Sequence, residues 1–150
     1  MTPAISDQHT SSIAKILSAN DTGDTGGHQA GLLVPKEKEI LDFFPSLDVE
    51  TLNPRVHLVF RDDAGERWEF AFIYYNNRLF GGTRNEYRLT RMTNYIRTHR
   101  LRPGDRVVLE RDTEHRYFIS YERRAPSTKW MDGVLRLGAN WIVIPTGDRA

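Results

Sequence analysis

Three residues between positions 21 and 28 have side chains that bind metal ions or act in hydrolysis in many enzymes. Asp21, Asp24 and His28 lie in the glycine-rich run NDTGDTGGHQAG, which spans residues 20–31. Carboxylate and imidazole groups are common ligands of catalytic metals. One interpretation is therefore a complete small metal-dependent nuclease or hydrolase that uses these three side chains. Their spacing matches neither an EF-hand loop nor a zinc motif, so we keep this interpretation as an alternative.

The tripeptide Asp-Thr-Gly occurs twice in this run, at residues 21–23 and 24–26. It is the signature of aspartic proteases, in which two aspartates from separate lobes or subunits share one proton. Two copies in consecutive tripeptides cannot supply that geometry. The run also lacks the Gly-Lys-Ser/Thr of a phosphate-binding loop. The sequence therefore disfavours a protease and a nucleotide hydrolase.

A second group with recognisable chemistry is Arg84, Glu86 and Arg88, which stand at every second position. In an extended segment these three side chains lie on one face. In the major groove of DNA, arginine donates to O6 and N7 of guanine, and a carboxylate accepts from the amino group of cytosine. A carboxylate near phosphates is electrostatically costly, which favours a base contact for Glu86. An ion-pair ladder on an exposed strand explains the same spacing, so both interpretations stay open.

The positive charge of the chain is concentrated around this triplet. From Arg78 to Arg102 there are seven arginines and one acidic residue, for a net charge of +6, whereas the rest of the chain carries −5. Only four of the 21 basic residues are lysines, and guanidinium groups bind phosphate and guanine with two parallel hydrogen bonds. This segment therefore predicts a nucleic-acid interface. Within it we expect Arg97 and Arg100 to contact phosphates.

Length and composition limit the class of protein. The chain has 150 residues, of which 39% are hydrophobic and 27% charged, and it contains no cysteine. We expect one domain with a single core. The start of the chain lacks the features of a signal peptide, and no apolar run is long enough to cross a bilayer. We therefore expect a soluble cytoplasmic protein without membrane contact.

Short strands that alternate with turns dominate the predicted secondary structure. Two hairpins stand out, one over residues 55–62 and 66–75 and one over residues 106–112 and 115–123. In the first hairpin, Asp62 and Asp63 begin the turn. The remaining elements are expected as strands over 11–20, 133–137 and 140–145, an extended segment over 31–36, and short helices within 36–44 and 92–101.

About seven strands with one or two short helices indicate a mainly β (α+β) domain, either a barrel or a sandwich. Within it, Trp68, Tyr74 and Tyr75 offer a third interpretation, a protein-interaction barrel that uses aromatic side chains. Aromatic residues in such strands are more often part of the core.

Three motifs resemble a known family. Residues 17–23 and 25–29, together with Gly31, closely resemble the start of the N-terminal effector domain of EcoRII-like restriction endonucleases. Residues 76–88 are similar to the second DNA-contacting arm of that family. The turn at residues 101–105 resembles one in the plant B3 DNA-binding domains, which share the fold.

This resemblance implies a seven-stranded open DNA-binding pseudobarrel over residues 1–150, with two arms that hold the duplex from the major groove. It also implies recognition of the pseudopalindrome CCWGG, where W is A or T. The partner is then double-stranded DNA, and we expect the isolated domain to be a monomer. We also expect the protein to come from a prokaryote.

The resemblance also implies which residues contact DNA. The list has Asn20, Asp24, Thr25, His28 and Gln29 on the first arm, and Arg78, Arg84, Asn85, Glu86, Arg88 and Arg91 on the second. Asp24 departs from the family pattern, and it could accept from a cytosine amino group or orient a neighbouring arginine.

A nuclease core is not recognisable in these residues. Restriction-type cores need an acidic residue and a Glu/Asp-x-Lys pair on adjacent strands to hold Mg²⁺. Only Lys38 has comparable neighbours, in Glu37-Lys38-Glu39, and the pattern there predicts a helix. We expect this domain to be non-catalytic and without a cofactor, and we expect Mg²⁺ in a separate C-terminal nuclease domain.

Overall fold

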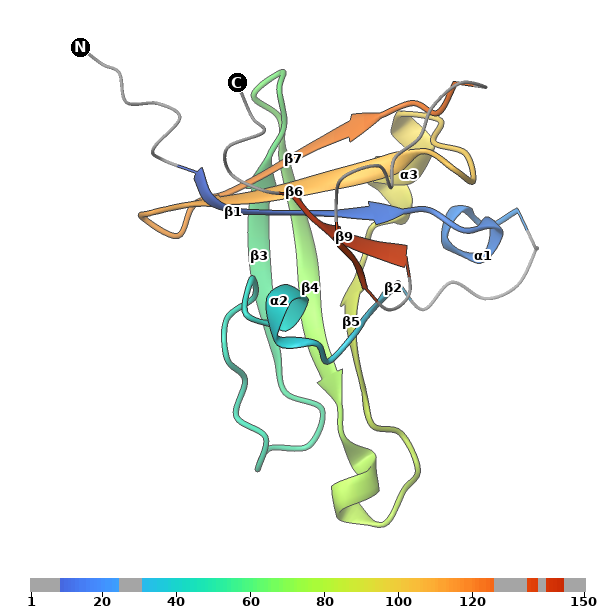
Figure 1. The fold of residues 1–150 in the computed structure, drawn as a ribbon. Helices are drawn as coiled ribbons and strands as arrows, with labels where there is room; N and C mark the ends of the chain where they lie inside the picture. Colours follow the sequence, from blue (N-terminus) through green and yellow to red (C-terminus); the bar gives the residue numbers. More distant parts are fainter. Residues whose placement is uncertain (1–8, 25–30, 126–134, 138–139, 145–150) are drawn as a thin grey trace.

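One curved sheet accounts for most of the fold (Figure 1). The computed structural model describes residues 9–24, 31–125, 135–137 and 140–144. Within these ranges nine strands follow the order β2-β5-β4-β3-β7-β6-β1-β9-β8. The strands are β1 (His9–Ile16), β2 (Leu32–Val34), β3 (Arg55–Arg61), β4 (Arg67–Tyr75), β5 (Glu86–Thr90), β6 (Arg106–Asp112), β7 (Tyr117–Glu122), β8 (Leu135–Leu137) and β9 (Trp141–Val143).

In the described residues four short helices lie between the strands, namely α1 (Ala19–Thr22), α2 (Lys38–Leu41), the 3₁₀ helix η2 (Asn77–Phe80) and α3 (Thr93–Thr98). The helices predicted within 36–44 and 92–101 are confirmed as α2 and α3. None of the helices in the described ranges is long and apolar enough to cross a membrane.

The two predicted hairpins are confirmed as β3–β4 and β6–β7, both antiparallel. The side chain of Asp62 closes the first turn, because it accepts the backbone N–H groups of Ala64 at 2.9 Å and Glu66 at 2.8 Å. It also accepts the indole N–H of Trp68 at 2.9 Å. The Asp62 carboxylate thus serves the turn, as expected.

The sheet curves until its two ends meet. The hairpins are joined by a parallel contact between β3 and β7, where Phe60 is opposite Tyr117. At the open side, the indole N–H of Trp141 on β9 donates to the carbonyl of Leu33 on β2 at 2.7 Å. A side chain therefore closes the pseudobarrel where backbone pairing stops.

Aromatic side chains fill the barrel. Phe44, which follows α2, stacks on Phe72 of β4 with ring centroids 4.3 Å apart. Trp68 packs edge-on against Tyr95 of α3 at 5.1 Å, and Tyr74 is 8% exposed. Trp68 and Tyr74 thus pack with the core rather than forming an exposed aromatic surface.

The mainly β fold class with short helices is confirmed, and two details differ from expectation. The described residues contain nine strands rather than seven, because short segments such as β5 also pair with the sheet. The first strand ends at Ile16 rather than at residue 20. There Ser18 caps α1, since its hydroxyl accepts the N–H of Asp21 at 3.1 Å and gives the chain a helical turn.

Candidate nucleic-acid interface

The base of the first arm contains a buried ion pair. The Nζ atom of Lys15, on β1, lies 2.7 Å from Oδ2 of Asp21, and the two side chains are 5% and 8% exposed. The same carboxylate oxygen accepts the backbone N–H of Ser18 at 2.9 Å. A buried ion pair adds little net stability, because both charges lose their hydration, but these contacts join β1 to the start of α1. Asp21 therefore shapes the start of the arm.

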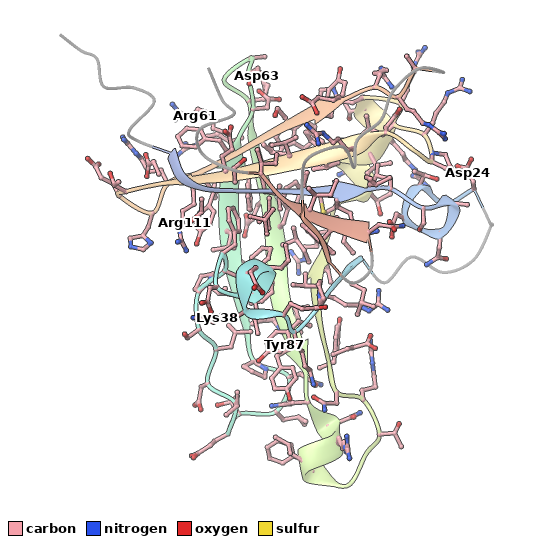
Figure 2. All side chains as sticks on the ribbon, viewed as in Figure 1. Asp24, Lys38, Arg61, Asp63, Tyr87 and Arg111 are labelled. Atoms are coloured by element: carbon pink, nitrogen blue, oxygen red, sulfur yellow. The ribbon has the colours of Figure 1, made fainter. Side chains whose placement is uncertain are left out.

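Asn20 and Asp24 lie on the surface at this arm. Both are exposed, and Figure 2 shows Asp24 at the edge of the molecule, where the chain leaves α1. Gly23, with a φ of 86°, ends α1 just before Asp24. The hydroxyl of Thr22 donates a hydrogen bond to the Asp24 carboxylate at 2.8 Å. Thr25, His28 and Gln29 lie outside the described residues.

These positions bear on the hydrolase alternative. Asp21 is bound to Lys15 in the interior, whereas Asp24 is exposed and bound to Thr22. The described residues contain no group of three or more His, Cys, Asp or Glu side chains that could hold a metal ion. Nothing in the described geometry therefore brings Asp21 and Asp24 to one reaction centre.

The second arm is the connection from β4 through η2 to β5, which extends away from the barrel in Figure 1. Asn77 folds it back, because its side-chain oxygen accepts the N–H of Arg84 at 2.6 Å and its carbonyl accepts the N–H of Gly82 at 2.7 Å. The N–H of Arg78 donates to the carbonyl of Arg84 at 3.0 Å. These bonds give the arm a defined shape.

A fully buried amide fixes the base of this arm. The side chain of Asn76, 0% exposed, donates to the carbonyls of Val49 at 3.0 Å and Thr51 at 2.8 Å. Its oxygen accepts the N–H of Asn53 at 2.7 Å. The arm is thereby attached to the loop before β3.

Arg84, Glu86 and Arg88 form a continuous row of ion pairs. Nη2 of Arg84 lies 2.9 Å and Nε of Arg88 lies 2.5 Å from the same Glu86 oxygen. Hydrogen bonds from Arg88 and then from Arg84 lower the pKa of Glu86 and keep it ionised. The predicted shared face is confirmed, and the contacts are those of the ladder that the spacing left open.

Aromatic packing supports the outer arginine. The guanidinium of Arg84 lies over the ring of Tyr75, 3.8 Å from its centroid, a cation–π contact. Asn85 is held as well, because its side-chain oxygen accepts the hydroxyl of Tyr74 at 2.6 Å. Two tyrosines at the end of β4 therefore orient two residues of the second arm.

The two arms meet at their bases. Nη1 of Arg88 donates to the carbonyl of Gly31 at 3.0 Å, where the first arm enters β2. Gly31 has a φ of +90°, and a Cβ at this position would lie 2.5 Å from the carbonyl oxygen of Leu89. Glycine is required here because β2 and β5 approach so closely.

A cavity of about 260 Å³ opens between the bases of the two arms. Side chains or backbone from both arms line it, including Asp21, Gly31, Tyr75, Arg84 and Arg91. Arg91 is exposed and has a left-handed backbone with a φ of 68°, an uncommon conformation that is frequent at functional sites. Arg78 is exposed near the tip of the second arm.

Sequence reasoning missed two residues that position the arms, Lys15 and Tyr75. A lysine among apolar residues of a strand indicates a buried charge that needs an acidic partner, and Lys15 has such neighbours in Ala14 and Ile16. The sequence predicts Tyr75 either as a core residue or as part of a protein-interaction surface. Its place two residues before Asn77 gave no sign that it would stack on Arg84.

Known proteins resemble this chain over most of its length. Residues 6–101 match the family described as "Restriction endonuclease EcoRII, N-terminal". The chain is 51% identical over 81 residues to the type II restriction enzyme EcoRII of Escherichia coli. The matched region covers 51% of this chain and 20% of the enzyme. It is 32% identical over 108 residues to a putative B3 domain-containing protein of Oryza sativa subsp. japonica, covering 71% of this chain and 32% of that protein.

The fold is similar to that of FUS3 in the Arabidopsis FUS3–DNA complex, with a TM-score of 0.58 and 21% identity over 75% of this chain and 96% of that one. The matched part of the chain spans 20% of the length of EcoRII. The family match includes both candidate arms. The chain therefore belongs to the family of EcoRII N-terminal domains, DNA-binding domains of restriction enzymes with the B3-type fold.

Proposed function

We propose that this chain reads a short G·C-rich sequence in double-stranded DNA, with CCWGG as the expected target. The two arms enter the major groove, and each reads about half of the nearly symmetric site. The observation that carries this proposal is the row of Arg84, Glu86 and Arg88, which shares one face beside the cavity between the arms.

The row has the donors and acceptors that such a target needs. CCWGG contains four G·C pairs, which present guanine O6 and N7 acceptors and cytosine amino donors in the major groove. A guanidinium has five N–H donors, and the contacts to Glu86 use one from Arg84 and one from Arg88. Glu86 accepts both through Oε2, so on this proposal Oε1 is the acceptor for a cytosine amino group.

The ion pairs prepare these side chains before DNA arrives. A guanidinium held by Glu86 and stacked on Tyr75, as Arg84 is, loses less conformational freedom on binding. On the first arm, Asn20, Asp24, Thr25, His28 and Gln29 are proposed as the matching contacts. Asn85, Arg78 and Arg91 complete the second arm.

Cleavage is proposed to reside outside these 150 residues, in a nuclease domain that uses Mg²⁺. In the chain itself, Lys38 forms an ion pair with Asp42 one turn along α2, which favours a structural role for the Glu37-Lys38-Glu39 sequence. Purified chain incubated with plasmid and Mg²⁺ should leave the plasmid intact. Sequence-specific nicking that His28→Ala abolishes would establish the hydrolase alternative instead.

Selection of bound duplexes from a random pool tests the target directly. The proposal expects enrichment of CCWGG after a few rounds, followed by tighter binding of this site than of singly substituted sites. Enrichment of an unrelated sequence would keep the DNA-binding role and refute the target. Recovery without any shared sequence would refute specific reading altogether.

A further inference from the structure

The α3–β6 turn and the end of β7 carry arginines that belong to neither arm. Arg100 and Arg102 lie between α3 and β6, and Arg123 and Arg124 directly follow β7. All four are exposed. Three of them lie beyond residues 6–101, the range that matches the family. We refer to these four residues as the arginine cluster.

A buried carboxylate joins the two segments that form the cluster. Asp105, 4% exposed, accepts the backbone N–H groups of Arg102 and Arg124, each at 2.8 Å. The Arg123 guanidinium donates to the carbonyl of Arg100 at 3.0 Å. Residues more than 20 positions apart are thereby fixed next to one another by contacts to the backbone.

The backbone of the turn is shaped around these side chains. Gly104 has a φ of +96°, and a Cβ there would lie 2.7 Å from Cδ of Arg124. The side chain of Arg124 therefore lies directly over the turn. Arg100 itself has a φ of 53°, a left-handed conformation that costs free energy for a residue with a side chain.

The cluster gathers positive charge with little compensation. In the described part of the chain, its ion pair is that of Arg123 with Asp105 at 3.5 Å. Glu122, the next acidic residue along β7, pairs with Arg106 instead. Like charges on neighbouring segments repel one another, and a polyanion that binds them relieves the repulsion.

The cluster adjoins the base of the first arm. The N–H of Leu17 donates to the carbonyl of Asp105, and the N–H of Gly104 donates to the carbonyl of Leu17, both at 2.9 Å. Leu17 directly precedes Ser18, the cap of α1. Figure 1 shows α1 and α3 at the same end of the barrel, and the two helices contact each other.

We propose that the arginine cluster binds the phosphates of the DNA that flanks the recognition sequence on the side of the first arm. Double-stranded DNA has one negative charge per about 1.7 Å of its axis, so a duplex held by the first arm presents a row of anions beyond the site. The inference rests on the proposed function, because the first arm must hold the DNA there. It assigns to Arg100, Arg102, Arg123 and Arg124 affinity without base discrimination.

The double variant Arg102→Gln/Arg124→Gln tests this assignment. Both residues bind Asp105 through backbone N–H groups, which the substitutions retain. Fluorescence anisotropy would compare CCWGG duplexes with a short or a long flank on each side, over a range of salt concentrations. The wild-type chain should bind more tightly when one flank is extended, and the variant should lose that gain. The slope of log K against log salt should become shallower by about 0.9 for each lost phosphate contact.

Arg61→Gln is the control for loss of an exposed arginine elsewhere, since it removes one positive charge where β3 pairs with the start of β7. It should keep the flank dependence and the salt slope, and thermal melting should show all variants folded. A wild-type slope in the double variant, or a loss of discrimination between CCWGG and substituted sites, would overturn the inference. Absence of any preference for CCWGG in the wild type would instead refute the proposed function, and the salt slopes would still decide the role of the cluster.

Discussion

At the scale of single residues, Arg84 and Arg88 bind one carboxylate from two sides. If they read guanine, Arg84→Ala or Arg88→Ala should lose about 1–3 kcal/mol of discrimination, the contribution of one bidentate pair. Gel-shift titrations with CCWGG and base-substituted duplexes measure this loss.

The control for both substitutions is Arg61→Ala, at an exposed position on β3. It should leave discrimination unchanged. Equal losses on cognate and substituted duplexes would show that Arg84 and Arg88 act as a structural ladder or as phosphate contacts rather than as base readers.

Asp62 gives a prediction about pH. Burial alone would raise its pKa, but the hydrogen bonds from Trp68, Glu66 and Ala64 together outweigh this and lower it. A carboxyl group with a lowered pKa in the folded state stabilises the fold above its ordinary pKa of about 4, and this contribution disappears as the pH falls through the folded value.

Urea denaturation between pH 7 and pH 3 checks this prediction. The free energy of unfolding should decline at the acid end, and Asp62→Asn should decline less steeply over the same range. Parallel curves for the two proteins would contradict the assigned role of Asp62. Asp112 holds the equivalent β6–β7 turn, with a lowered pKa for similar reasons, and therefore remains as a background slope in both.

The sequence identified the residues whose chemistry shows in their type and spacing, such as Glu86 within an arginine-rich segment. It could not identify Lys15 as the partner of Asp21, because their contact depends on how β1 enters α1. A repeated Asp-Thr-Gly resembled catalytic chemistry, yet its first aspartate is a buried positioning group. Residue type alone does not distinguish these roles, since burial decides between them.

At the scale of elements, the close approach of β2 and β5 depends on Gly31. Gly31→Ala should destabilise the domain by more than the roughly 1–2 kcal/mol that a left-handed residue costs, because the added Cβ would meet the backbone of Leu89. It should also weaken DNA binding, since Gly31 accepts the hydrogen bond from Arg88.

Gly65→Ala separates the two causes. Gly65 also has a positive φ, of +84°, but nothing lies within 4 Å of the added Cβ. Chemical denaturation should therefore show the smaller cost for Gly65→Ala and unchanged DNA affinity. Equal destabilisation by both substitutions would mean that the steric contact at Gly31 relaxes without cost.

Elements with local signals were predictable. The β3–β4 hairpin is set by alternating side chains and an Asp-rich turn, which are adjacent in the sequence. The predicted end of the first strand, at residue 20, was wrong, because a capping box at Ser18 and Asp21 starts a helix there instead. The sequence could not show that residues 86–90 form a strand, since the extended form of β5 depends on pairing with β4 on one side and β2 on the other.

At the scale of the whole molecule, Trp141 closes the barrel through its bond to Leu33. Trp141→Phe should destabilise the fold by about 1–3 kcal/mol, because the partly buried hydrogen bond to the Leu33 carbonyl is lost and that carbonyl is left without its indole donor. DNA affinity should fall too, since Leu33 lies on the strand that follows the first arm. Denaturation and anisotropy measure the two effects.

Trp68→Phe is the control, because it removes an indole donor from the turn at Asp62 instead. It should lower stability and leave DNA affinity unchanged. If Trp141→Phe were to lower stability alone, closure of the barrel would have no influence on the arms.

The mainly β architecture followed from strand spacing and from the family resemblance, whereas the closure did not. Nothing in the sequences around Leu33 and Trp141 announces their contact, because it joins residues 108 positions apart. Only two of the four residues of the arginine cluster could be predicted from the sequence, for the same reason. Arg100 and Arg102 fell within the basic segment, but Arg123 and Arg124 join them only after β7 has paired with β6.

The closure by Trp141 has a consequence for the order of events during synthesis. The ribosome makes the first arm and β2 early, yet β2 receives the Trp141 bond only after more than 100 further residues have been made. Contacts between distant residues also form slowly, because a long loop must close first. The first arm therefore reaches its final support only after β9 has been made and has paired, and a nascent chain that lacks β9 should bind DNA more weakly than the chain that contains it.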